Sequence, residues 1–327
     1  MAVGKGRHTS GLYAFEWVIL AYAAFTLLLM AVLWGRLVSP WTMLAGRAGV
    51  VLATLALWQL SRHVASRNEK WERPLLLLRV VAQLMLLGWW YPDTYELNRV
   101  LPNLDHLFAQ YEQTLFGCQP ALLFSQHFSS PWVSEPLCLG YFSYYPMIGI
   151  VTFYYFFRYY ERFAYASFVI LGSFFLFYVI FIFLPVAGPQ FYYEAVGVDQ
   201  IAQGYFPDLG HYFLNHQQSL PIPGTDSGLF HYLVQDAHNA GERPTAAFPS
   251  SHVGVSVVLL WLAWEVRSRR LFVVLLLLTV LMFFATFYIQ AHYAIDAIAG
   301  LFAGTALYFL LRWLYTKRQQ ISFRRRA

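Results

Sequence analysis

The apolar residues of this chain are gathered into eight segments, each close to the length that a helix needs to cross a membrane. A transmembrane helix needs about 20 predominantly apolar residues to span the hydrocarbon core of a bilayer. The segments are residues 17–34, 41–60, 74–91, 136–157, 163–184, 248–264, 271–291 and 292–311. The sequence therefore predicts an all-α, polytopic integral membrane bundle of about eight transmembrane helices.

The composition argues against a soluble fold. Hydrophobic residues make up 58% of the 327 residues and charged residues only 12%, whereas soluble proteins are about a quarter charged. The aromatic content of 19% fits the belts of Trp and Tyr that lie at membrane surfaces. The net charge of +5 does not indicate nucleic-acid binding, because the basic residues stand between the apolar segments, where they act as topology signals.

The basic residues are distributed unequally between the two sides of the predicted bundle. With a cytoplasmic N-terminus, 17 of the 22 Lys and Arg fall on the inner side. The inner residues are Lys5, Arg7, Arg62, Arg67, Lys70, Arg73, Arg158, Arg162, Arg267, Arg269, Arg270, Arg312, Lys317, Arg318, Arg324, Arg325 and Arg326. The outer residues are Arg36, Arg47, Arg99 and Arg243. Arg79 lies inside a helix and is expected to extend toward the inner surface. Because cytoplasmic loops are rich in Lys and Arg, both termini are predicted to be cytoplasmic, with an even number of spans.

No repeat or linker divides the chain, so a single membrane domain over residues 1–327 is predicted. Its expected parts are the N-terminal helices (1–91), an outer interfacial segment (92–135), a helix pair (136–184), an outer loop (185–249), the helices with the candidate catalytic residues (250–314) and a basic cytoplasmic tail (315–327).

A polar pair stands at the start of the last apolar segment. Asp296 follows His292 by four residues, and this spacing places both side chains on one face of a helix. The carboxylate can then accept a hydrogen bond from one ring nitrogen, which makes the other nitrogen a better base or nucleophile. The alternative is a structural pair, because an ionisable group near lipid needs a partner.

A second candidate element precedes the apolar segment that begins at Val253. Pro249, Ser250 and Ser251 are typical of helix starts, and the unpaired N–H groups of a first helical turn bind phosphate well. His252 would lie beside such an anion, where it can act as an acid or a base. An ordinary N-cap with an interfacial histidine is the alternative.

The predicted topology brings these elements to the same outer face. The helix after His252 runs inward, the basic turn at 267–270 is inside, and the next helix returns outward to His292. Arg243 lies nine residues before His252 on the same side. Together these groups indicate a site for a phosphate ester. The candidate catalytic residues are His252, His292 and Asp296, and the candidate substrate-binding residues are Arg243, Ser250 and Ser251.

Two stretches resemble signature motifs of a known family. Phe248-Pro249-Ser250-Ser251-His252 and His292-Tyr293-Ala294-Ile295-Asp296 are similar to the second and third motifs of the type 2 phosphatidic acid phosphatase superfamily, usually P-S-G-H and S-R-x5-H-x3-D. The resemblance is specific over residues 243–304. It implies that His292 attacks phosphorus to form a phosphohistidine, that Asp296 orients His292, and that His252 protonates the leaving oxygen. It implies no metal and no cofactor.

The chain also departs from these motifs. The departures are Asp236 in place of the lysine of the first motif (K-x6-R-P), Thr286 in place of the arginine of the third motif, and Ser251 in place of glycine. Arg243 and Pro244 of the first motif are present. This pattern resembles the inositol phosphorylceramide synthase branch, which has F-P-S-x-H and H-Y-x-x-D. Residues 184–189 and 115–117 are also similar to that branch.

The resemblance leaves two reactions open. Transfer of a phosphoinositol-type head group to a ceramide-type lipid alcohol is favoured over hydrolysis, which would make the protein a phosphatase for phosphatidic acid or prenyl phosphates. A non-enzymatic transporter is the weaker alternative, because its polar groups would interrupt the middle of several helices. The expected partners are a phospholipid donor and a lipid alcohol or water, without nucleic acid. The expected location is a bacterial inner membrane, with the site on the extracytoplasmic face.

The remaining polar residues are given no catalytic role. His211, His216, His231 and His238 form no recognised metal-binding pattern and are expected to be loop histidines or head-group contacts. Asp93, Glu96, Asp105 and Glu112 are interpreted as a solvated acidic face. Cys118 and Cys138 have no metal-type spacing and form either two free thiols or a disulfide.

Overall fold

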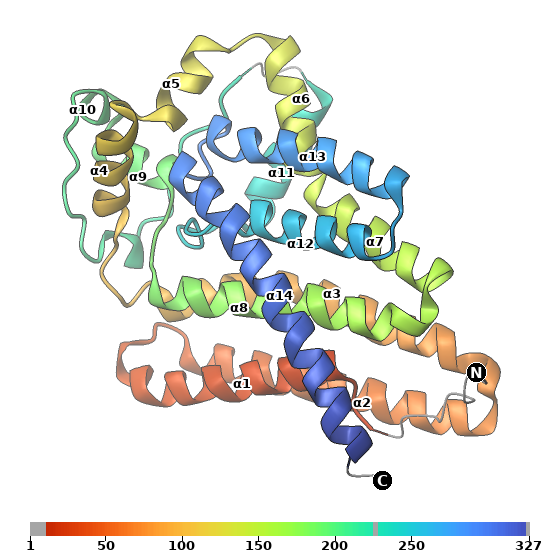
Figure 1. Ribbon diagram of the computed structural model, residues 1–327. Coiled ribbons are helices and arrows are strands. Elements are labelled where there is room, and N and C mark those ends of the chain that lie inside the picture. Colours follow the sequence, from red (N-terminus) through yellow and green to blue (C-terminus); the bar gives the residue numbers. More distant parts are fainter. Residues whose placement is uncertain (1–10, 225–227, 325–327) are drawn as a thin grey trace.

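The structure is a computed structural model that describes residues 11–224 and 228–324. These residues form helices connected by turns and loops, without a strand among them. Figure 1 shows most of the long helices running in similar directions, with the last helix crossing them obliquely. The prediction of an all-α membrane protein is confirmed, since six helices are long and apolar enough to cross a membrane.

These six helices correspond to six of the predicted segments. They are α1 (Ala14–Leu33), α2 (Pro40–Arg67), α3 (Glu72–Asn98), α8 (Phe163–Phe183), α13 (Arg269–Tyr288) and α14 (Ala294–Arg324). α3 continues past residue 91 with Pro92 inside the helix, so the predicted helix end at 91 is wrong. α14 likewise continues through most of the segment that was expected to be a tail.

The other two predicted segments are helical but irregular. The segment at 136–157 consists of α6 (Pro131–Phe142) and α7 (Tyr144–Arg158), which are bent by 44° relative to each other. The segment at 248–264 forms α12 (Ser251–Glu265), with 15 residues. At about 1.5 Å per residue, α12 is about 22 Å long, which is shorter than the roughly 30 Å hydrocarbon core. α12 is therefore not among the helices that are long enough to cross a membrane.

Short helices occupy the two predicted outer segments. The first outer segment contains α4 (Asp105–Phe116) and α5 (Pro120–His127), and the second contains α9 (Pro189–Val196), α10 (Val198–Ala202) and α11 (Leu229–Gly241). In Figure 1 these helices gather at one end of the long helices, around the start of α14.

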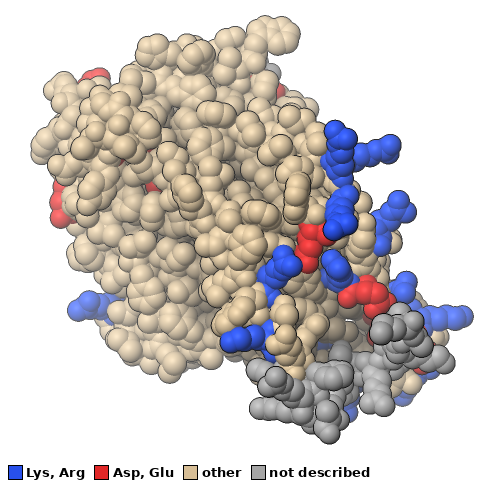
Figure 2. All heavy atoms as spheres, viewed as in Figure 1, with Lys and Arg blue, Asp and Glu red and all other residues tan. Residues whose placement is uncertain are grey.

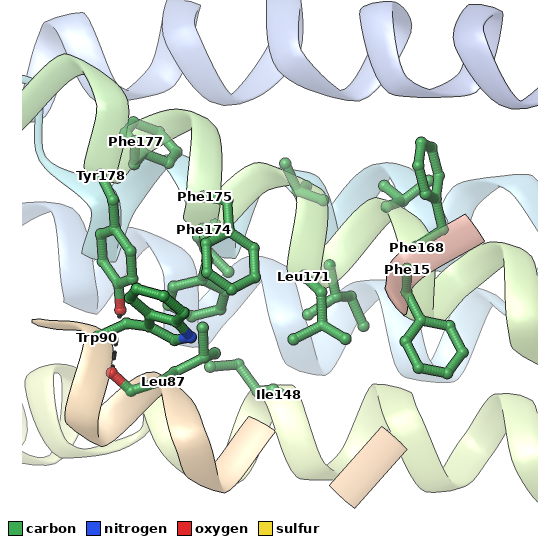
Figure 3. Close-up of a cluster of buried hydrophobic side chains, with 14 of the residues drawn as sticks. Phe15, Leu87, Trp90, Ile148, Phe168, Leu171, Phe174, Phe175, Phe177 and Tyr178 are labelled. Carbon is green, nitrogen blue, oxygen red and sulfur yellow. Dashed lines mark hydrogen bonds between the residues drawn. The ribbon is translucent and has the colours of Figure 1, made fainter. Parts of the chain in front are cut away.

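The central helix of the bundle is α8, whose side chains are apolar and mostly buried on all sides. It packs against α1, α3, α7, α12 and α14. Figure 3 shows its Phe174, Phe175 and Tyr178 next to Trp90 of α3, and the Tyr178 hydroxyl donates to the Leu87 carbonyl oxygen at 3.4 Å. A helix that is hydrophobic all round is typical of a core position. α8 therefore packs against helices from both the N-terminal and the C-terminal half of the chain.

Two buried ion pairs join the first three helices. Arg47 of α2 donates to both carboxylate oxygens of Asp93 of α3, at 2.8 and 2.6 Å. Arg79 of α3 donates to both oxygens of Glu16 of α1. Arg79 is thus buried and paired with a carboxylate in the first turn of α1, the end of that helix predicted to be cytoplasmic. Asp93 is likewise buried and paired rather than part of a solvated face.

The Lys and Arg of the described residues lie mainly at one end of the bundle. Figure 2 shows them along the right side of the molecule, where Figure 1 places the turns α2–α3, α7–α8 and α12–α13. α12 and α14 begin at the opposite end. Of the basic residues predicted to be inside, Lys5, Arg7, Arg325 and Arg326 lie outside the described residues.

We expect Asp93→Asn to destabilise the protein by about 3–5 kcal/mol, because it leaves the Arg47 guanidinium buried without a counter-charge. A combined Arg47→Met and Asp93→Leu replacement should cost much less, since no charge is then left buried. Thermal unfolding in detergent micelles measures both. An Asp93→Asn variant as stable as the double variant would contradict this assignment.

Candidate active site

Small residues allow α12 and α14 to approach each other closely. A Cβ atom added at Gly304 would lie 2.2 Å from the carbonyl oxygen of Gly254, and one added at Gly300 would lie 2.6 Å from that of Ser250. Both distances are too short for any side chain. The Ser250 N–H also donates to the Asp296 carbonyl oxygen at 3.0 Å. The start of α12 is therefore held against the start of α14.

The loop between α8 and α9 supports the turn that precedes α14. The Val186 carbonyl oxygen accepts from the Ala247 N–H at 3.0 Å, and the Gln190 N–H donates to the Gln290 carbonyl oxygen at 2.8 Å. Gly188 has a φ of +96°, and a Cβ there would lie 2.5 Å from the Ala291 carbonyl oxygen. Only glycine fits this position, so the loop packs directly on the backbone beside residue 292.

His292 lies in the turn between α13 and α14, with an exposed fraction of 4%. Its Nδ1 is 2.7 Å from the Ala247 carbonyl oxygen. A carbonyl oxygen can only accept, so Nδ1 carries the hydrogen and Nε2 keeps its lone pair. Burial lowers the pKa of His292 to about 4, although the bond to Ala247 and the charge of Glu242 act in the opposite direction. His292 is thus a neutral imidazole at pH 7 with a free nucleophilic nitrogen.

His252 lies in the first turn of α12 and faces His292. Its Nδ1 is 3.4 Å from Nε2 of His292, which is long for a hydrogen bond. The His252 ring packs between Tyr141 and Tyr144, at centroid distances of 4.6 and 4.5 Å. The two histidines that the sequence placed on one face are therefore adjacent in the structure.

Asp296 has a different partner from the one expected. Its Oδ2 is 3.8 Å from Nδ1 of His292, beyond hydrogen-bond range, and accepts instead from the Tyr293 N–H at 2.8 Å. The Ala247 carbonyl oxygen takes the role of orienting the His292 ring. Asp296 is fully buried.

The three candidate substrate-binding residues have different positions. Ser250 caps α12, where its Oγ accepts from the Val253 N–H at 3.4 Å, and it is fully buried. Ser251 and Arg243 line the cavity described below. Arg243 Nη1 donates to the Glu242 carbonyl oxygen at 2.9 Å. Thus Ser251 and Arg243 can contact a ligand, while the Ser250 side chain stabilises the helix start.

A cavity of about 620 Å3 extends from His252 between α3 and α7. Its lining includes the polar residues His238, Glu242, Arg243, Ser251 and His252. Its other walls are apolar and aromatic, and include Val81, Leu84, Met85, Ile148, Phe153 and Phe174. A chamber with a few polar groups and mostly apolar walls fits an amphiphile.

Sequence analysis assigned no role to three acidic residues of this region, of which Glu242 is partly buried and Asp105 and Glu112 are fully buried. Glu242 Oε1 accepts from the Tyr91 hydroxyl at 3.0 Å, and burial raises the Glu242 pKa. Asp105 and Glu112 are fully buried, so their interpretation as a solvated face is wrong. Asp105 and Glu112 stand in a polar stretch of sequence. They are buried because segments distant in the chain cover them. The one feature of the sequence that could have indicated a role for Glu242 is its position directly before Arg243.

The motif positions at which the family has a lysine and an arginine carry no positive charge in this chain. Asp236 is exposed on α11, and Thr286 is buried in α13 with its hydroxyl donating to the Phe283 carbonyl oxygen at 2.8 Å. Within the described residues no group of three or more His, Cys, Asp or Glu could hold a metal ion. Cys118 and Cys138 are free thiols.

Comparison with known proteins adds independent information. A family model of the PAP2 superfamily matches residues 107–310, which is more than half of the chain. This chain belongs to the PAP2 superfamily. No curated protein and no solved structure matches it. The predicted membership is thereby confirmed.

Membership in the PAP2 superfamily makes this chain an enzyme, a phosphatase or phosphotransferase. The apolar helices make it an integral membrane protein, and the superfamily assignment indicates lipid phosphates as its substrates. Both histidine motifs and the cavity-lining Glu242 and Arg243 fall within the matched residues.

We expect low pH to destabilise the protein through His292. The pKa of about 4 lies below the ordinary value of about 6.5, so between these values the unfolded chain binds a proton that the folded protein excludes. This linkage corresponds to about 2 kcal/mol between pH 6.5 and 5. The melting temperature of His292→Asn in detergent should therefore fall less than that of the wild type over this range. His216→Asn, at an exposed histidine, is the matched control, and identical pH slopes in all three proteins would contradict the assignment.

Proposed function

We propose that this protein transfers a phosphoinositol-type head group from a phospholipid to a ceramide-type lipid alcohol through a phosphohistidine on His292. The main supporting observation is the position of His252 and His292, 3.4 Å apart, with His252 in the lining of a cavity whose walls are mostly apolar. Such a cavity can take the hydrocarbon of a lipid and present its phosphate to the histidines.

In the first half of the proposed reaction, the Nε2 lone pair of His292 attacks phosphorus. The N–P bond forms, the P–O bond to the diacylglycerol oxygen breaks, and His252 gives its proton to that oxygen. In the second half, the hydroxyl of the acceptor gives its proton to His252 and attacks phosphorus, and the N–P bond breaks. Both histidines return to their starting states. The phosphoryl group must enter between the two rings, which have to separate on binding.

In its proposed role as the acid, His252 must carry a proton once the substrate is bound. A protonated imidazole is stabilised by the electron-rich faces of aromatic rings, and the His252 ring packs against two tyrosines. The first helical turn of α12 adds N–H groups that face an anion. The N–H groups stabilise the charge on phosphate, and the bound phosphate is the counter-charge that keeps the buried His252 ring protonated before transfer.

The shortage of positive charge favours a phosphodiester over a phosphomonoester. Arg243 is the one Lys or Arg among the described residues that line the cavity, and Glu242 is beside it. A phosphomonoester carries close to two negative charges at pH 7, whereas a phosphodiester carries one. A phospholipid with an alcohol head group is a diester, and it therefore matches this site better than phosphatidic acid does.

Glu242 is proposed to contact the head group. Its Oε1 is bonded to Tyr91, while its other oxygen has no hydrogen-bond partner among the described residues. A carboxylate repels phosphate and attracts hydroxyl hydrogens, so it would recognise a polyhydroxyl head group.

The proposed placement has eight spans, cytoplasmic termini and the site at the extracytoplasmic side. The gathering of Lys and Arg at the end opposite to the site supports this orientation through the excess of positive charge in cytoplasmic loops.

The proposed function predicts a new ceramide lipid. Purified protein in mixed micelles with fluorescent ceramide and phosphatidylinositol should form a slower-migrating ceramide product, and His292→Ala should form none because the nucleophile is absent. Parallel reactions contain phosphatidic acid or a prenyl phosphate. Release of inorganic phosphate without a new lipid would make the protein a lipid phosphatase instead.

The covalent step can be observed separately. With phosphatidylinositol labelled at phosphorus, the protein should carry an acid-labile label that is absent from His292→Ala and retained in His216→Ala. A label that persists in His292→Ala would show that another residue is the nucleophile.

We expect Glu242→Gln to lower kcat/KM with phosphatidylinositol by about tenfold or more, because a hydrogen bond to a charged group contributes about 1.5–3 kcal/mol. Activity with a phospholipid whose head group has no hydroxyl should change little. Tyr91→Phe keeps the carboxylate and is the matched control. An equal loss with both lipids would argue against head-group contact.

A further inference from the structure

Three carboxyl groups are buried around the start of α14, and they are not equally satisfied. Asp105, Glu112 and Asp296 each have an exposed fraction of 0%. Asp105 accepts four hydrogen bonds, from Asn103 Nδ2, the Ala187 and Gly188 N–H groups and the Tyr293 hydroxyl, at 2.5 to 3.1 Å. Four donors offset much of the cost of burying a carboxylate, although burial still raises the Asp105 pKa.

Glu112 and Asp296 lack such compensation. Glu112 Oε1 accepts from the Ala294 N–H at 2.5 Å, and the Ile295 N–H also interacts with the Glu112 carboxyl group. Asp296 Oδ2 accepts from the adjacent Tyr293 N–H at 2.8 Å. The two carboxyl groups therefore bind neighbouring peptide groups of the same turn. Their second oxygens, Glu112 Oε2 and Asp296 Oδ1, are both buried without a hydrogen-bond partner among the described residues.

Two buried oxygen acceptors cannot satisfy each other unless one of them carries a proton. Leaving both unpaired would cost several kcal/mol, and two adjacent charges would repel each other strongly in this dry environment. The titratable groups that face the pair are His292, whose Nδ1 is already bonded to Ala247, together with Tyr193, Tyr293 and Asp105. None of these groups brings a positive charge to the pair, since His292 is neutral.

We propose that Glu112 is protonated and donates from Oε2 to Oδ1 of Asp296, so that the pair holds one negative charge and fixes the turn that carries His292. Glu112 is then a positioning residue, which acts on His292 through Asp296 and the backbone of residues 293 and 294. Burial and the nearby Asp296 raise the Glu112 pKa to about 8, in agreement with a proton held at pH 7. The catalytic consequence rests on the proposed function of His292, whereas the shared proton does not.

Protonation of Glu112 has a defined effect on stability. Between the ordinary pKa of about 4.5 and the folded value of about 8, the folded protein holds a proton that the unfolded chain has lost. Stability therefore decreases as pH rises through this range. Glutamine has nearly the shape of the protonated acid and an N–H donor that does not titrate.

The first experiment is thermal unfolding of Glu112→Gln in detergent at pH 6 to 9. The wild type should lose more stability with rising pH than the variant, and at pH 8.5 the variant should melt at least about 3 °C higher, a shift typical of 1 kcal/mol or more. Glu194→Gln, at an exposed glutamate of α9, should follow the wild type. Equal slopes for Glu112→Gln and wild type, or a Glu112→Gln variant that does not fold, would overturn the proposal.

The second experiment measures turnover against pH. Glu112→Gln should stay within about threefold of wild type at pH 6.5 and remain active at pH 9, where the wild type declines because both carboxyl groups ionise. Glu112→Ala should lose at least tenfold at both pH values, because Oδ1 of Asp296 then has no donor. A Glu112→Gln variant as inactive as Glu112→Ala would overturn the positioning role. If the wild type turns over none of the lipids, the proposed function fails, and the unfolding experiment alone decides whether the proton is shared.

Discussion

The close crossing of α12 and α14 is the contact on which the arrangement of this protein depends. Within a bilayer, apolar side chains gain little by leaving lipid for a protein neighbour, so helix association relies on close packing of small residues. Gly254, Gly300 and Gly304 provide that contact, and the backbones of the two helices touch where a Cβ atom would clash. His252 and His292 become neighbours because each stands at the end of one of these helices.

The site beside this crossing has little exposure to solvent and little charge. α12 is too short to cross the hydrocarbon core, so its first turn can lie below the membrane surface and still be reached through the cavity. The walls there come from α3, α7 and α8, which are apolar and rich in tyrosine. Burial keeps His292 neutral, and His252 is surrounded by aromatic rings instead of carboxylates. Positive charge is therefore limited to Arg243 and the helix N-terminus.

The parts of the structure that follow from local sequence were predictable. All eight apolar segments are helical, and the topology placed His252 and His292 on one face, where the structure brings them together. The partners of these residues were not predictable, because they come from distant segments. The i, i+4 spacing indicated Asp296 as the acceptor for His292, but the Ala247 carbonyl, 45 residues away, occupies that position. Every residue has a backbone carbonyl group, so the sequence does not indicate which one accepts a hydrogen bond from His292. Asp105 and Glu112 look solvated in sequence and are buried by contacts with residues 82 to 188 positions away.

The burial of His292 also bears on the choice between an alcohol and water as the acceptor in the proposed reaction. Before a substrate binds, the His292 side chain is only 4% exposed. The apolar walls of the cavity pass between α3 and α7, where the side chains of Met85 and Phe153 are also exposed on the outside of the bundle. A lipid alcohol from the membrane can enter along these walls with its hydrocarbon in contact with apolar groups, and its hydroxyl then arrives at the histidines. This route is the argument for a lipid acceptor within the proposed function, since the shared catalytic motifs alone do not distinguish the alcohol from water.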